Sequence, residues 1–323
     1  MKIYETKVEA GTKQWLEIPV DEECSLKAAA FCGSRPGKRL IVTAGVHGCE
    51  YIGILAVSRL IQELDPRQMK GEVVFLPIAN EGGFYKEIKQ LVPEDGVNLN
   101  RSAKIAAAVE TYLYPGADFL VDLHSGDIHE MVVPFAFFPV AAGETVEKEA
   151  AASARAMSLS WRVASTAKNG LYSWAAQKGI PALLLERGGL GRWTEREVDA
   201  YRINLYELLV HLDILPESIL ESVKGMNLKD SESSPESEVL PSGKIEQREI
   251  RIMRYLEAPG NGFWYPAIRE GSCLKKGDLL GEIRRLDGSL MYRYESELDG
   301  MVFYYTLSLG VSEGEPLVAY GEC

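Results

Sequence analysis

Histidine and cysteine are scarce in this chain, and long apolar runs are missing. Only four histidines and five cysteines occur among its 323 residues. The cysteines are odd in number and form no C-x-x-C pair, which argues against a disulfide framework and against a thiolate zinc site. No segment approaches the ~20 consecutive apolar residues that a membrane-spanning helix needs. The opening residues, MKIYETKVEAG, lack the apolar core of a signal peptide. We therefore expect a cytoplasmic protein with free thiols and no membrane partner.

Positive charge is also in deficit. The formal net charge is −12, so the long-range field of the protein repels polyanions and argues against nucleic acid as a partner. A small anionic substrate remains compatible with this charge, because a single local arginine can hold it. Apolar residues make up 46% of the chain and charged residues 25%, which is typical of a globular protein.

Short apolar runs alternate with helical patterns over roughly the first 215 residues. The segment at 39–46, RLIVTAGV, reads as a buried strand, and apolar residues then recur at helical spacing from Ile52 to Leu64. Strands alternating with helices predict an α/β fold with a mostly parallel sheet covered on both faces. The other strands are expected at 72–80, 117–125, 132–140, 158–166 and 180–189.

The composition changes after residue 223. Residues 224–244 are polar and rich in Ser, Glu and Pro, which is typical of a linker or surface loop. Residues 245–323 contain short apolar runs separated by glycine turns, and Asp287-Gly288 is a hairpin signal. We predict a catalytic domain at 1–223, a linker at 224–244 and a small all-β domain at 245–323.

A candidate metal site follows from the positions of two histidines. His47 and Glu50 fall where the strand at 39–46 gives way to a helix, and His124 falls at the end of the strand at 117–125. Ligands of open α/β sheets bind outside the carboxyl ends of the strands, so these three residues can converge. Two imidazoles and one carboxylate form a catalytic zinc set whose fourth position is left for water. An H-x-x-E pair by itself is a weak signal, and the alternative is a polar turn.

Three further positions carry candidate chemistry. Glu186 ends an otherwise apolar run, LLLERGG, where an acid is costly unless it is paired or functional; it could pair with Arg187 or Arg192, or act as a general base. Asn100 and Arg101, in DGVNLNR, could grip a substrate carboxylate or lie on a solvated loop. Asp122 shares a strand face with His124 and could orient its imidazole, although a capping role fits equally well.

The motifs GVHGCE, DGVNLNR, DLHSG and ERGG occur in this order in the chain. In order and rough spacing they resemble the succinylglutamate desuccinylase/aspartoacylase family, over roughly residues 35 to 210. The resemblance implies a zinc-carboxypeptidase-like fold and one zinc held by His47, Glu50 and His124. It also implies that Glu186 is the general base, that Asn100 and Arg101 bind a substrate carboxylate, and that the reaction is hydrolysis of the amide in a small N-acyl amino acid.

The chain departs from the family pattern around the substrate rather than around the metal. Ser102-Ala103-Lys104 follows NLNR where a Phe-Pro-Gly-like segment is usual, so the acyl group is left open. Two alternatives to a deacylase remain: a zinc carboxypeptidase on short peptides, and a catalytically inactive metal-dependent binding protein.

The C-terminal segment resembles lipoyl or biotinyl carrier domains. Such carriers have a lysine at the hairpin tip, whereas this chain has Asp287-Gly288, so no attached cofactor is expected. We expect this segment to shape the rim of the active site or to form a homo-oligomer interface.

Overall fold

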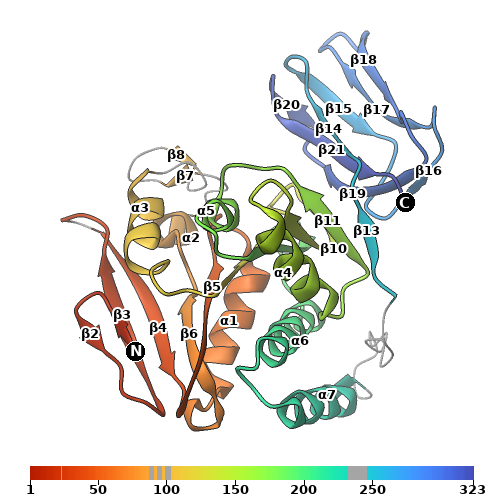
Figure 1. Ribbon diagram of the computed structural model, residues 1–323. Coiled ribbons are helices and arrows are strands. Elements are labelled where there is room, and N and C mark those ends of the chain that lie inside the picture. The colour runs from red at the N-terminus through yellow and green to blue at the C-terminus, as the bar shows by residue number, and fades with distance from the viewer. Residues whose placement is uncertain (23, 87–90, 93–96, 99–102, 232–245) are drawn as a thin grey trace.

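The computed structural model describes residues 1–22, 24–86, 91–92, 97–98, 103–231 and 246–323. Within these residues a central sheet is flanked by helices, and further strands follow at one end of the molecule (Figure 1). The architecture is mixed α/β, as the alternation of apolar runs and helical patterns predicts.

The α/β part contains eight neighbouring strands in the order β11-β10-β12-β9-β5-β6-β4-β3. The pairs β12/β9, β9/β5 and β5/β6 are parallel, while β10/β12, β6/β4 and β4/β3 are antiparallel. The strands span Trp161–Ser165, Glu130–Pro139, Ala182–Gly189, Phe119–Leu123, Arg35–Ala44, Lys70–Leu76, Ser25–Cys32 and Thr12–Pro19, in that order. The parallel strands at the centre carry the candidate site residues at their carboxyl ends.

Helices bury both faces of this sheet. One apolar cluster combines the sheet with α1 (Tyr51–Glu63), α4 (Glu144–Arg155), α6 (Glu195–His211) and α7 (Glu217–Ser231). The other includes α3 (Ala103–Tyr112) and α5 (Leu171–Gln177). Leu60 of α1 and Leu205 of α6 have no exposed surface, and burying each such side chain stabilises the fold by roughly 1.5–3 kcal/mol.

The predicted strands at 39–46, 72–80, 117–125, 132–140, 158–166 and 180–189 correspond to β5, β6, β9, β10, β11 and β12, and the predicted helix corresponds to α1. The antiparallel hairpin β3–β4 had no predicted counterpart. Most of β3 is exposed, and β4 is rich in alanine, which has low strand propensity, so neither shows a strong strand pattern.

The segment after the α/β part differs from its prediction in one respect. Residues 224–231, part of the predicted linker, form the C-terminal half of α7, while 232–244 lie outside the described residues. The strands that follow are β13 (Arg248–Ile250), β14 (Met253–Glu257), β15 (Gly262–Pro266), β16 (Cys273–Leu274), β17 (Leu279–Arg284), β18 (Leu290–Glu295), β19 (Gly300–Thr306), β20 (Gly310–Val311) and β21 (Pro316–Gly321).

These later strands join the central sheet, because β13 pairs with β11 and β19 pairs with β10. The hairpin at Asp287-Gly288 is confirmed: β17 and β18 pair antiparallel, and Gly288 has a φ of +84° in the turn. The domain boundaries and the likeness to a carrier domain stay predictions. In the described part of the chain, no helix combines the length and apolar character that crossing a membrane requires.

Candidate metal centre

His47 and Glu50 lie in the turn between β5 and α1. β5 ends at Ala44, and Glu50 is the residue directly before the first turn of α1. Gly48 lets this turn approach α2 (Glu81–Lys86), because a Cβ at position 48 would lie 2.2 Å from the carbonyl carbon of Gly83. Gly48 therefore lets the His47 turn pack against α2, where a larger residue would displace it.

His124 reaches the same place from the adjacent strand. β5 and β9 are parallel with Thr43 opposite Asp122 and Ala44 opposite Leu123, so the residues after both strands emerge side by side. His47 Nδ1 lies 2.6 Å from Glu50 Oε1, and His124 Nδ1 lies 3.0 Å from Glu50 Oε2. One donor atom from each of the three residues falls within 4.8 Å of the others. The structure thus brings together the three residues singled out in the sequence.

Asp122 orients the imidazole of His124. Its Oδ2 lies 3.1 Å from His124 Nε2, and its Oδ1 accepts a hydrogen bond of 2.5 Å from the Thr43 hydroxyl. Asp122 and Thr43 have no exposed surface. A proton on Nε2 that faces Asp122 leaves Nδ1, which faces Glu50, free to bind a cation. The orienting role considered for Asp122 therefore matches the geometry, and Thr43 is a partner that the sequence analysis missed.

Replacing Asp122 by asparagine is expected to lower metal affinity by about 10- to 100-fold, the usual effect of losing a carboxylate behind a ligand histidine. Asparagine keeps the shape but loses the charge that favours the Nε2 tautomer. Competition with a chromogenic chelator measures the affinity. Affinity equal to that of the wild type would contradict the orienting role.

The electrostatics of the three residues suit a cation. Burial by itself would raise the pKa of Glu50, but His47 and His124 outweigh it and lower the pKa to about 2. Burial would likewise lower the pKa of His124, but the charges of Glu50 and Asp122 hold it well above its usual range. Glu50 Oε2 is buried, and beside its ion-pair contact with His124 it accepts no hydrogen bond from the residues that the structure describes. A carboxylate oxygen of this kind between two imidazoles fits a divalent metal such as zinc.

Glu186 lies beside this group on β12. The backbone N–H of His124 donates to Leu185 O at 2.8 Å, which places Glu186 one residue beyond the contact between β9 and β12. Arg187 is buried and forms an ion pair with Glu197 at 2.8 Å. The pairing of Glu186 with Arg187 or Arg192 does not occur, and none of the described residues forms an ion pair with Glu186.

The environment of Glu186 favours its protonated form. Burial raises its pKa to about 8; His124 opposes the rise, while the carboxylates of Glu50, Glu130 and Asp122 add to it. A carboxyl group with a pKa near neutrality can exchange protons in both directions at physiological pH, which is what a general base that later acts as an acid requires.

The stability of the metal-free protein should therefore depend on pH through Glu186. Its pKa is about 8 in the folded chain against an ordinary 4.5. Between these values the folded state binds more protons than the unfolded state, so the free energy of unfolding falls as pH rises through this window. The loss is on the order of a few kcal/mol, since one pKa unit is worth about 1.4 kcal/mol. Urea unfolding of chelator-treated protein from pH 5 to 9 measures this loss of stability. In Glu186→Gln the free energy of unfolding should depend less on pH. Identical pH profiles for both proteins would contradict the prediction.

Gly189 of the ERGG motif lets β12 lie close to β10. Gly189 has a φ of +149°, and a Cβ there would lie 2.0 Å from the Glu130 carbonyl oxygen. Tyr304 of β19 donates a hydrogen bond of 2.7 Å to Glu130 Oε1. The C-terminal strands thus contribute a side chain next to a carboxylate that influences Glu186, a contact that no motif in the sequence indicated.

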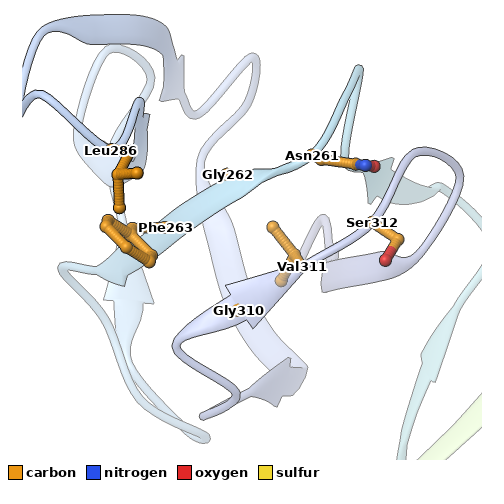
Figure 2. A pocket seen from close by; sticks show the side chains of 7 residues that line it. All are labelled: Asn261, Gly262, Phe263, Leu286, Gly310, Val311 and Ser312. Carbon is orange, nitrogen blue, oxygen red and sulfur yellow. The ribbon is translucent and has the colours of Figure 1, made fainter.

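The predicted carboxylate-binding residues, Asn100 and Arg101, lie outside the described residues. A hollow of about 380 Å³ occurs elsewhere, among the C-terminal strands (Figure 2). Its lining contains no ionisable side chain and no histidine, so it offers no chemistry for hydrolysis. It is lined by Asn261, Gly262, Phe263, Leu286, Gly310, Val311 and Ser312.

The central sheet presents two histidines and a glutamate at the carboxyl ends of its parallel strands. The fold and the site are therefore those of an α/β protein with a candidate metal centre. The sequence matches the model of the succinylglutamate desuccinylase/aspartoacylase catalytic domain over residues 36–212, more than half of the chain. The protein belongs to this family.

Individual relatives cover nearly the whole chain. An N-alpha-acetyl-L-2,4-diaminobutyric acid deacetylase from Halomonas elongata is 28% identical over 95% of this chain and 90% of its own length. The product-bound ectoine utilization protein EutE (DoeB) from Ruegeria pomeroyi has a TM-score of 0.78 and 22% identity, covering 97% of this chain and 95% of its own. A succinylglutamate desuccinylase/aspartoacylase from Rhodobacter sphaeroides has the same TM-score and identity, over 96% and 95% of the two chains. The two structures share the fold with this chain.

Proposed function

We propose that this protein is a zinc-dependent hydrolase that cleaves the amide bond of a small N-acyl amino acid. The convergence of His47, Glu50 and His124 within 4.8 Å is the observation that carries the proposal. Membership of the family, and a curated relative that is a deacetylase, support a deacylase.

Each of the site residues has its own role in the proposed hydrolysis. His47, Glu50 and His124 would hold the zinc, which when bound lowers the pKa of a water molecule and polarises the substrate carbonyl. Glu186 takes a proton from the attacking water and delivers it to the nitrogen of the leaving amine as the C–N bond breaks. Its raised pKa suits both transfers. Asn100 and Arg101 anchor the substrate carboxylate and so fix the carbonyl in place.

The acetyl group is the first acyl group to test, because the curated relative is named for an N-acetylated diamino acid. A small substrate also fits the position of the C-terminal strands. The hydrogen bond between Tyr304 and Glu130 puts β19 close to Glu186, which favours a small substrate over a peptide chain.

Release of free amine from a panel of substrates tests the proposal. The panel contains N-acetyl, N-succinyl and N-formyl amino acids together with short peptides, each with and without a chelator. Chelator-sensitive release from one acyl class is the expected result and identifies that class. Release from peptides alone would favour a carboxypeptidase, and silence with zinc still bound would favour a binding protein.

A further inference from the structure

Tyr201 contacts both strands that carry the candidate chemistry. It lies on α6, has no exposed surface, and directs its hydroxyl at the carbonyl oxygens of His124 and Leu185. The distance to Leu185 O is 2.9 Å, and the contact with His124 O is shorter still. One carbonyl belongs to a proposed metal ligand, and the other belongs to the residue directly before the proposed general base.

The position of this hydroxyl matters because β9 ends here. The β9/β12 register runs from Ala182 opposite Leu120 to Leu185 opposite Leu123. Beyond it, the His124 N–H donates to Leu185 O. The Tyr201 hydroxyl is a second donor for Leu185 O and a donor for His124 O, which lies beyond the last paired residue of β9. Without that donor, Leu185 O would keep only the His124 N–H and the buried His124 O would lose the Tyr201 hydrogen bond, so the strand ends could shift relative to each other.

Neighbouring groups hold the tyrosine ring in place. The Arg187 guanidinium lies over the ring, 5.3 Å from its centre, and is itself fixed by the ion pair with Glu197. Glu197 lies four residues before Tyr201, one turn earlier on the same helix. The ring is therefore held by contacts from β12 and from α6, and these contacts keep its hydroxyl directed at the two carbonyl oxygens.

We propose that Tyr201 is a positioning residue that sets His124 and Glu186 at the separation the reaction needs. This role rests on the proposed function. It assigns no contact between Tyr201 and the substrate or the metal. A displacement of about 1 Å at a reacting group can cost up to about 100-fold in rate. Loss of the hydroxyl should therefore act on kcat, while KM should change little because the substrate-anchoring residues lie elsewhere in the sequence.

The experiment compares two tyrosine-to-phenylalanine variants of the same helix. Y201F removes the hydroxyl between the strand ends. Y206F removes the hydroxyl of another buried tyrosine, which donates to the partly exposed Glu63 at 3.1 Å, away from the site. Both variants lose one oxygen atom and keep the ring. Far-UV circular dichroism and thermal unfolding establish the folded fraction of each, and all rates are taken well below the lower melting temperature.

Two readouts are measured on each protein: kcat and KM on the substrate identified by the amine-release panel, and the visible absorption spectrum after loading with Co²⁺. We expect Y201F to lower kcat at least tenfold, to leave KM within about twofold and to shift the Co²⁺ bands, because His124 moves. Y206F should match the wild type in both. A loss of stability by itself would neither lower kcat of the folded enzyme at unchanged KM nor shift the Co²⁺ spectrum.

Equal kcat values and Co²⁺ spectra for Y201F and Y206F would overturn the proposal, and so would a Y201F that fails to fold where Y206F folds. A wild-type protein that is silent across the panel would instead refute the proposed hydrolase. The Co²⁺ spectra of the two variants would still decide whether Tyr201 positions His124.

Discussion

Replacing Glu186 by glutamine is expected to reduce kcat by about 10³-fold or more while the metal content stays that of the wild type. Glutamine has nearly the same shape but cannot accept the proton of the attacking water or return it to the leaving amine. General acid–base catalysis contributes about 10²- to 10⁴-fold, and Glu186 would serve in both directions. The measurement is kcat on the preferred substrate together with metal content by atomic absorption.

The matched control is Glu110→Gln, the same chemical change at a residue whose carboxylate pairs with Lys178 on the outside of the molecule. This variant should retain the full wild-type rate. If Glu186→Gln kept kcat within about threefold of the wild type, Glu186 would not be the general base. A large loss of metal in Glu186→Gln would point instead to a role in holding the ion.

Replacing His47 by alanine is expected to abolish stable metal binding and, with it, activity. Removing one of the three proposed protein ligands should cost more than the 10- to 100-fold that loss of an outer partner costs. His47 suits the test because its side chain is partly exposed, whereas removal of His124 would leave the buried Asp122 without its imidazole partner. Titration with zinc against a competing chelator, and kcat/KM at a fixed zinc concentration, give the two values.

His129→Ala is the control for this experiment. The side chain of His129 is exposed. Its backbone carbonyl accepts hydrogen bonds from Thr306 Oγ1, at the end of β19, and from the Leu307 N–H. Losing its imidazole should change neither zinc affinity nor rate. Zinc binding by His47→Ala equal to that of His129→Ala would contradict the assignment of His47 as a ligand.

Much of the α/β architecture could be predicted because its signal is local. The buried central strands are short β-branched and apolar runs, and α1 shows apolar residues at helical spacing, so both patterns appear within a dozen residues. The hairpin β3–β4 escaped because its side chains carry little hydrophobic contrast. The N-terminal part of the predicted linker is helical because Val223 and its neighbours on α7 pack against the core that α1 and α6 form, a gain that composition does not reveal.

The same division holds for the site. The residue types that could form it are readable in the sequence, because His47, Glu50, His124 and Glu186 stand at the ends of apolar runs, where a parallel sheet presents its ligands. Which atoms face one another depends on how the strands and helices pack. The β5/β9 register brings Asp122 to Thr43, the alternation along β12 turns Arg187 toward Glu197 and leaves Glu186 beside His124, and α6 delivers the Tyr201 hydroxyl to the strand ends. All of these contacts but Arg187–Glu197 join residues far apart in the chain, and their energies depend on burial that exists only once the sheet and its helices have packed.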